Sequence, residues 1–159
     1  MVNKMLNLFK KKDNVFHVVA CIDGKCIPIS EVKDPVFAEK MIGDGFAIVP
    51  SGDTVVAPIG GEIVSLFPTG HAIGIAHKGI KVLIHIGIDT VNMEGEGFTP
   101  LIKKGDVVKA GQPIMKLDMD KLKASGYDLT TMTIFTSGYD KPVKLSCYND
   151  DVKSGDILI

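Results

Sequence analysis

After residue 14, the chain consists of short apolar runs separated by turns rich in glycine, aspartate and proline. Most runs have the length of strands and are too short for helices, and several alternate apolar and polar residues. Many short strands at close spacing predict an all-β fold, an antiparallel β-sandwich with barrel character. Helical patterning is confined to residues 37–42 and 119–124. The predicted strands are 15–22, 25–28, 46–50, 54–57, 61–68, 71–77, 80–88, 106–108, 113–117, 131–135, 144–147 and 156–159.

Residues 1–14 have a different pattern from the rest of the chain. On a helix, Met1, Val2, Met5, Leu6 and Phe9 would share one face, with the lysines mostly elsewhere. Such a basic amphipathic segment is suited to the surface of an anionic membrane, and residues 1–12 are the candidate contact. The alternative is a solvated tail, because helices this short are marginal alone. We therefore predict a flexible tail at 1–14 and a single domain at 15–159.

Composition narrows the possible functions. The 159 residues carry a formal net charge of −1, which argues against a nucleic-acid binder that needs a basic face. All eighteen basic residues are lysines, so a bound anion must be held without a guanidinium group. Three cysteines and no secretory signal favour a reducing cytoplasm over a disulfide framework. No apolar run is long enough for a membrane-spanning helix.

The most informative segment is a predicted hairpin at residues 69–91, with its turn at Lys78-Gly79. In its second strand, alternation places four aliphatic side chains on one face and His85, Gly87 and Asp89 on the other. Gly87 leaves room around the imidazole of His85, and its carbonyl can accept a hydrogen bond from Nδ1. The face therefore carries a ring nitrogen that is free for chemistry.

The register of the hairpin decides whether His71 joins His85. A two-residue loop pairs His77 with Ile80 and His85 with Ala72, and strand alternation then turns His71 to the other face. A three-residue loop places His71 directly opposite His85. The residues alone leave both registers open.

Two facing imidazoles suit phosphoryl chemistry. A neutral imidazole is a competent nucleophile near neutral pH, and a second ring can donate a hydrogen bond to a phosphate oxygen. Thr69 precedes His71 by two residues, so its hydroxyl can orient that ring. The alternative is a pair of ordinary surface histidines.

Residues 79–91 (GIKVLIHIGIDTV) carry a family resemblance. This stretch resembles the signature of glucose-type IIA components of the bacterial phosphoenolpyruvate-dependent sugar phosphotransferase system. The pattern is a glycine, three aliphatics, a histidine, a glycine between aliphatics, any residue, a threonine and an aliphatic, and every position is met. Further segments similar to the family are 37–40, 43–45, 56–58, 71–72 and 95–98.

The resemblance implies a phosphotransferase component that needs no cofactor. His85 would take a phosphoryl group that originates in phosphoenolpyruvate and arrives through enzyme I and the phosphocarrier protein HPr. It would pass the group to a cysteine of a sugar-specific IIB domain of a membrane permease. His71 matches the phosphate-contacting histidine, Thr69 the hydroxyl that supports it, Gly87 the positioning carbonyl, and Asp89 an acidic residue at the docking rim. The apolar docking face implied by the family contains Phe37, Met41, Ile42, Phe67, Leu83 and Val91.

The family also implies a β-sandwich, a cytoplasmic location that can include the inner face of the membrane, and a three-residue type of hairpin loop. The sequence does not identify the sugar that is transported, because the IIB and IIC partners select it. Phe37, Met41 and Ile42 lie between polar residues, which favours partial exposure, whereas Leu83 and Val91 are also compatible with a core position.

Two other functions compete with this interpretation. His71, His77, His85 and Asp89 are residue types that bind catalytic zinc, so a zinc-dependent hydrolase built on His71, His85 and Asp89 is the first alternative. Zinc held opportunistically by His71 and His85 is compatible with a phosphocarrier. The second alternative is a biotin- or lipoyl-bearing domain modified at Lys116, but Met115-Lys116 follows the Gly105-Asp106 turn too closely, so Lys116 is predicted to be an ordinary strand residue.

Overall fold

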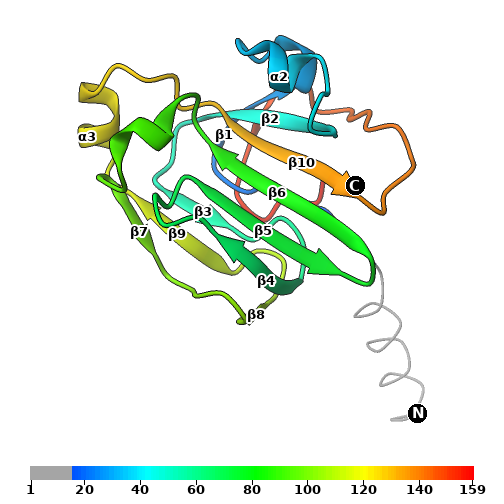
Figure 1. The fold of residues 1–159 in the computed structure, drawn as a ribbon. Coiled ribbons are helices and arrows are strands. Elements are labelled where there is room, and N and C mark those ends of the chain that lie inside the picture. The colour runs from blue at the N-terminus through cyan, green and yellow to red at the C-terminus, as the bar shows by residue number, and fades with distance from the viewer. Residues whose placement is uncertain (1–15) are drawn as a thin grey trace, which may run out of the picture.

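The computed structural model describes residues 16–159. The predicted tail at 1–14, with its candidate membrane contact at 1–12, lies outside the described residues. The described chain forms two facing antiparallel sheets, one of eight strands and one of three, which together make a β-sandwich (Figure 1). The all-β prediction is therefore confirmed.

The large sheet contains both histidine-bearing segments near its centre. Each neighbouring pair of its strands is antiparallel. In spatial order the strands are β11 (Asp151–Val152), β1 (Gly24–Pro28), β2 (Asp44–Pro50), β10 (Thr131–Ser137), β6 (Ile80–Ile86), β5 (Ala72–His77), β4 (Gly61–Leu66) and β8 (Val107–Val108).

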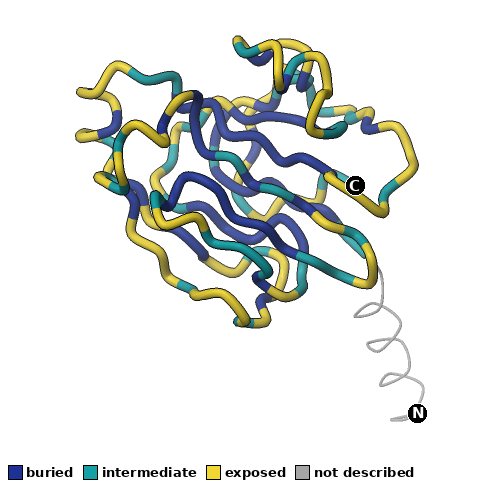
Figure 2. Tube along the Cα trace, in the orientation of Figure 1, coloured by how far each residue is buried: buried dark blue, intermediate teal, exposed yellow. Residues whose placement is uncertain are grey.

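The small sheet packs against the large one, and the main core lies between them. Its order is β3 (Thr54–Val56), β9 (Pro113–Leu117) and β7 (Phe98–Pro100). The buried trace in Figure 2 runs along the facing strands, while the exposed residues gather at the turns. In β6, Val82, Ile84 and Ile86 are buried as the alternation predicts. The tight aliphatic packing beneath β6 therefore fixes which side chains face outward.

Helices are few, as predicted. The segment α2 (Pro35–Ala38) begins at Asp34, whose carboxylate accepts a hydrogen bond from the Val36 amide, and Pro35 suits the first helical position. It begins and ends earlier than the predicted 37–42. The segment α3 (Met119–Ala124) has the predicted bounds. Two single 3₁₀ turns, η1 (Ile29–Glu31) and η2 (Thr90–Met93), complete the set. No helix among residues 16–159 has the length and apolarity required to cross a membrane.

Three predicted strands differ from the structure. Residues 18–22 are buried, but their one strand-type bridge joins Val19 to Ile157, a bridge that also takes the place of the predicted strand 156–159. Residues 144–147 end in a turn closed by the Asp150 amide and the Cys147 carbonyl, and β11 takes the place beside β1. Strand β7 was not predicted. An apolar run in the sequence predicts that the segment is buried. Whether the segment is a β-strand depends on which backbone groups it meets and hydrogen-bonds in the folded chain.

The hairpin β5–β6 has a two-residue loop. His77 pairs with Ile80, and Ala72 pairs with His85, so the three-residue type implied by the family resemblance is wrong. Lys78 and Gly79 both have positive φ, at 46° and 84°. Two consecutive residues with positive φ are typical of the type I′ turn, whose twist matches that of the strands it joins. The sequence analysis placed the turn at Lys78-Gly79, but it left the two-residue and three-residue loops open.

Candidate active site

His71 and His85 lie together despite the register that was expected to separate them. Their ring centroids are 5.1 Å apart, with the ring planes nearly perpendicular at 79°. Strand β5 begins only at Ala72, so the alternation of side chains does not extend back to His71. His71 lies in a bend, yet its carbonyl still accepts a hydrogen bond of 2.7 Å from the Ile86 amide. A break in the strand, rather than the loop length, thus brings the two imidazoles together.

The bend depends on Gly70. Its amide donates to the Phe67 carbonyl at 2.8 Å, which closes a turn immediately before His71. Gly70 has a φ of 71°, in the left-handed region that side chains disfavour, and a Cβ there would lie 2.8 Å from the Cβ of Phe98. Glycine at position 70 therefore permits a tight turn against Phe98 of β7, and this turn places His71 beside His85.

His85 is oriented by the backbone of its own segment. Its Nδ1 lies 2.8 Å from the carbonyl oxygen of Gly87, as the sequence predicted. Gly87 has a φ of 78°, and an added Cβ would overlap the methyl group of Thr90. The Gly87 amide donates to the Thr130 carbonyl at 3.0 Å, and the buried Thr90 hydroxyl donates to the Ile86 carbonyl. The Gly87 carbonyl, which faces the His85 ring, is consequently fixed by hydrogen bonds of the Gly87 amide and of the preceding Ile86 carbonyl.

Thr90 is the threonine of the family signature, but the sequence analysis assigned it no role. Its hydroxyl bonds back to the turn that carries Gly87, and the residue is fully buried. A buried threonine four residues after an acceptor carbonyl, in a segment rich in glycine, is a signal that could have identified it. It supports the site by holding the turn that follows His85.

His71 is oriented by a side chain. Thr69 Oγ1 lies 2.6 Å from Nδ1 of His71, so the predicted pairing is present. The edge of the His71 ring faces the ring of Phe67, with centroids 5.5 Å apart. His71 is only 5% exposed, and its surroundings leave it little freedom to rotate. Each histidine therefore has its Nδ1 occupied within the protein.

Burial controls the electrostatics of both rings. It lowers the pKa of His71, and it is also the main cause that lowers the pKa of His85, with the neighbouring His71 acting in the same direction. The Gly87 carbonyl and the carboxylates of Asp34 and Asp89 raise the pKa of His85, but they do not outweigh burial. The neutral imidazole is the form that carries a nucleophilic lone pair.

Two carboxylates lie beside the site, and only one of them was predicted. Asp89 is exposed and has a φ of 61°, at the point where β6 has ended and η2 begins. Asp34 precedes α2 and was not assigned a role, although an aspartate followed by proline is a recognisable helix start. Their negative charges lie on different segments that flank His85.

The predicted docking face divides into exposed and buried parts. Phe37 is only 6% exposed, so the expectation of its exposure is wrong. Its ring packs against His85, with centroids 4.8 Å apart, and lies in a small buried cluster with residues of β2 and β10. Leu83 is half-buried against the same cluster. The exposed members are Met41, Ile42, Phe67 and Val91.

The residues of the zinc hypothesis do not form a three-ligand site, although His71 and His85 lie together. Within the described range 16–159, no three histidine, cysteine, aspartate or glutamate residues gather in a way that could hold a metal ion. His77 lies at the far end of the hairpin, where its ring stacks on Phe16. Nothing in the site therefore favours a zinc-dependent hydrolase over phosphoryl chemistry.

Lys116 has the environment of a strand residue, as predicted. It lies within β9, where its ammonium group is 3.0 Å from the Asp53 carboxylate and donates to the Thr54 hydroxyl at 3.3 Å. A biotinylated or lipoylated lysine is presented at the tip of a hairpin, and Lys116 is not at a tip.

Comparison with known proteins gives a consistent picture. Residues 16–140 match the family model described as phosphoenolpyruvate-dependent sugar phosphotransferase system, EIIA 1. The chain is 43% identical over 144 residues to a glucose-specific EIIA component of Halalkalibacterium halodurans, covering 86% of this chain and 83% of that protein. It is 42% identical over 139 residues to a glucose-specific EIICBA component of Streptococcus pneumoniae, covering 87% of this chain but only 19% of that longer protein.

A solved structure gives the same result in three dimensions. The glucose permease IIA of Mycoplasma capricolum superposes with a TM-score of 0.83 at 38% identity, covering 92% of this chain and 96% of that one. The family resemblance that the hairpin residues suggested is therefore confirmed over nearly the whole described chain. The chain belongs to the EIIA family of the phosphoenolpyruvate-dependent sugar phosphotransferase system, whose members are phosphocarriers in sugar uptake.

Proposed function

We propose that His85 accepts a phosphoryl group on Nε2 from the phosphohistidine of HPr and passes it to a cysteine of a sugar-specific IIB domain. The observation that carries this proposal is the hydrogen bond between Nδ1 of His85 and the Gly87 carbonyl. A carbonyl oxygen can only accept, so Nδ1 must carry the proton. In the neutral ring the lone pair is then on Nε2, which is the nitrogen available to attack phosphorus.

His71 has the complementary role in this proposal. This role requires the Thr69 hydroxyl, 2.6 Å from Nδ1 of His71, to donate to that nitrogen, so that the ring proton is on Nε2. With the two rings 5.1 Å apart, that N–H can donate to an oxygen of a phosphoryl group on His85. Both rings are neutral before transfer, in keeping with burial that lowers the pKa of each. The site would thus meet a dianionic group with a fixed donor and no formal positive charge.

The transfer step is a displacement at phosphorus. The lone pair of His85 Nε2 forms the new P–N bond while the P–N bond of the donor phosphohistidine breaks and returns its electron pair to the donor ring. In the second transfer the IIB thiolate forms a P–S bond, and the electron pair of the breaking bond returns to His85. Little covalent rearrangement is required, so positioning and charge stabilisation supply most of the catalysis.

The surroundings of His85 suit successive protein partners. The exposed members of the predicted docking face would form its apolar part; they are Met41, Ile42, Phe67 and Val91. Asp34 and Asp89 would attract basic groups on the partner and set its orientation. Phe37 belongs to the wall of the site under this proposal and contacts a partner only through its edge, because it is almost completely buried.

We further propose that the IIB partner belongs to a permease of the glucose type and that the chain acts in the cytoplasm. Several relatives carry the word glucose-specific in their names, and those named EIICBA unite the IIA domain with the IIB and IIC components in one polypeptide. Another relative of the fused kind is named glucoside-specific, so the sugar must be established by assay with individual IIB domains.

The test is phosphorylation of the full chain by phosphoenolpyruvate with enzyme I and HPr. We expect one phosphate per chain, labile to acid and stable to alkali, and no phosphate on the variant His85→Asn. His77→Asn is the matched control, since His77 lies at the other end of the hairpin, and it should be phosphorylated normally. Phosphorylation of His85→Asn would overturn the proposal. Transfer from the labelled chain to purified IIB domains then identifies the sugar class.

A further inference from the structure

A second concave site lies at the opposite end of the hairpin from His85. The cavity has a volume of about 390 Å³ and lies where the start of the described chain meets the turns after β3, β5 and β8. Its walls include Phe16, which stacks on His77 with centroids 5.8 Å apart, and the backbone of Gly60 and Gly61. A volume of this size matches that of a small-molecule site.

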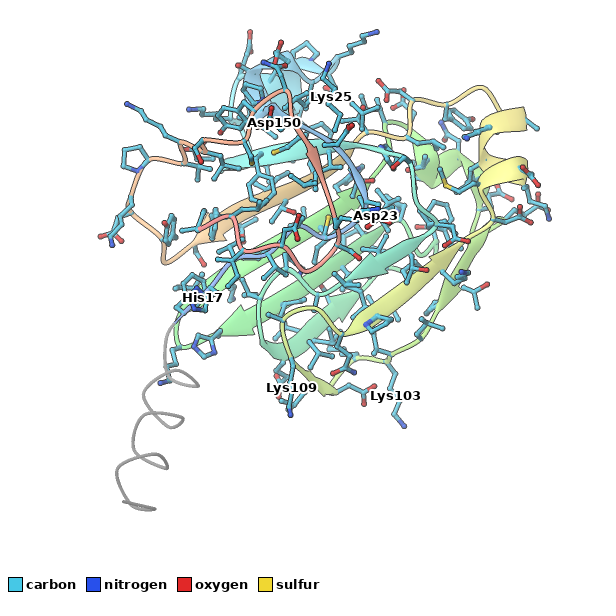
Figure 3. The ribbon with its side chains drawn as sticks, turned by 180° about the vertical axis from the view of Figure 1, so that it is seen from behind. His17, Asp23, Lys25, Lys103, Lys109 and Asp150 are labelled. Carbon is cyan, nitrogen blue, oxygen red and sulfur yellow. The ribbon has the colours of Figure 1, made fainter. Side chains whose placement is uncertain are left out.

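The charged and titratable side chains that line this cavity are His17, His77, Lys78 and Lys109. They come from segments that are far apart in the sequence, and Figure 3 shows His17 and Lys109 at the same end of the molecule. Among residues 16–159 the ion pairs join Lys40 to Asp44 and Lys116 to Asp53, so neither cavity lysine has a carboxylate partner there. Their charge is therefore available to a ligand.

Glu62 and Asp106 are next in sequence to cavity residues, but neither of them lines the cavity. Glu62 follows Gly61 in β4, and alternation along that strand turns it to the face opposite the one that Gly61 and buried Ile63 share. Asp106 precedes β8, and its carboxylate accepts a hydrogen bond from the Lys103 amide at 3.0 Å, which holds it within its own turn. The cavity thus combines basic donors with apolar lining from Phe16 and the buried Val108.

The cavity is separate from the phosphorylation site. His77 pairs with Ile80 at the hairpin turn, while His85 lies five residues farther along β6, a separation of about 17 Å at the usual rise of a strand. A ligand in the cavity could therefore be bound without obstructing the docking face around His85. No residue of the cavity contributes to the phosphoryl chemistry described above.

We propose that this cavity binds a small molecule through a phosphate group, with Lys78 and Lys109 as the charged donors and the Phe16–His77 stack as the apolar wall. Lysine ammonium groups bind phosphate as point charges, and this chain contains no arginine that could serve instead. The three oxygens of a phosphate group can be shared among donors that come from separate turns. Anionic lipid headgroups present the same chemistry, so the experiment must distinguish a free ligand from a membrane.

The experiment uses amide NMR spectra and calorimetry on the full chain, with inorganic phosphate and glucose 6-phosphate as probes and glucose as the uncharged control. The test variant is Lys78→Asn with Lys109→Gln. Asn-Gly is the favoured sequence for the turn that residues 78–79 form, so the hairpin is retained while the ammonium group is removed. Lys103→Gln is the matched control, because Lys103 is exposed at the same end but does not line the cavity.

We expect a phosphate probe to shift the amides of residues 16–17, 60–61, 77–78 and 107–110, and the double variant to bind it about tenfold more weakly. The Lys103→Gln protein should bind as the unchanged protein does, and glucose should give no shift. Phosphorylation of His85 should proceed normally in all three proteins, which separates this proposal from the proposed function.

Three results would overturn the proposal. The first is the absence of shifts at these amides with millimolar phosphate or glucose 6-phosphate. The second is equal binding by the double variant and the unchanged protein. The third is binding to phosphatidylglycerol vesicles that the double variant loses, without any response to the free probes, which would assign the lysines to a lipid surface instead.

Discussion

His85 and His71 point their rings at one another from two different kinds of backbone. His85 is on a regular strand, and a backbone carbonyl, that of Gly87, faces its Nδ1. His71 is in a bend before a strand, and a side-chain hydroxyl, that of Thr69, faces its Nδ1. The proposed nucleophile is thus fixed by the main chain, whereas its proposed helper is fixed by a group that a single substitution removes.

This difference predicts how each half of the site tolerates change. The position of the Gly87 carbonyl depends on a buried turn held by Thr90 and Thr130, so it is altered only by changing the fold locally. The Thr69 hydroxyl can be deleted with little effect on the backbone. Four experiments test the comparison.

The largest effect is expected from removing the His71 ring itself. His71→Ala should lower the rate of phosphoryl transfer by about a hundredfold, the typical effect of losing one donor to a developing charge. His71→Gln can place an amide N–H near the position of Nε2 and should recover part of that loss. Rapid-quench kinetics with phospho-HPr measure both. Equal rates in the alanine and glutamine variants would show that no donor is required at this position.

Among changes to the residues that position His85, Gly87→Ala should have the largest effect on stability and on phosphoryl transfer. The positive φ of 78° and the overlap with the Thr90 methyl should reduce the free energy of unfolding by about 2–3 kcal/mol. The displaced carbonyl should also slow phosphorylation of His85. Urea unfolding and the transfer assay measure the two effects. Gly79→Ala is the control for positive φ alone, because a Cβ there meets open space. A Gly87→Ala protein with the stability and rate of that control would contradict the backbone argument.

Thr69→Val should have a smaller effect that is confined to transfer. Loss of one hydrogen bond of about 1–1.5 kcal/mol predicts a rate roughly tenfold lower, while the melting temperature changes little because Thr69 is only half-buried. Thr69→Ser retains the hydroxyl and should transfer at nearly the normal rate. If serine and valine gave the same rate, the hydroxyl would have no part in orienting His71.

The smallest expected effect is on the pH dependence of the free energy of unfolding. Burial lowers the pKa of both histidines, so the unfolded chain binds their protons more readily than the folded chain. The free energy of unfolding should therefore decrease as the pH falls through about 6.5, the unfolded value, towards the lower folded values. Urea unfolding at several pH values should show a shallower slope in the variant carrying both His71→Gln and His85→Gln. An unchanged slope would mean that neither ring is significantly buried.

Much of the site could be predicted from the sequence, because its information is local. Thr69, His71, His85, Gly87 and Asp89 all lie in one hairpin, and their spacing alone suggested the two hydrogen bonds that the structure contains. Strand alternation also gave the correct burial of the aliphatic face of β6. The type and bounds of α3 followed from the same local patterns.

The predictions that the structure contradicts mainly involve contacts between segments that are distant in the sequence. Phe37 was expected to be exposed because its neighbours in the sequence are polar, but α2 folds over the sheet and buries the ring against His85. The run at residues 18–22 has the composition of a strand, yet its backbone amides bond to irregular segments such as Pro58 and Asp156. Local composition does not specify such partners.

The sequence by itself determined that the chain is a β-sandwich, because short apolar runs alternate with turns along its whole length. It also determined which nitrogen of His85 is free, because that depends on the spacing of His85 and Gly87 within one predicted strand. The phosphocarrier family followed from the resemblance of residues 79–91 to a known signature. Only the tertiary structure decided that His71 meets His85 across a two-residue loop. That meeting depends on Gly70 turning beneath Phe98, a residue from another sheet, and close packing between distant segments is not encoded in any short stretch of sequence.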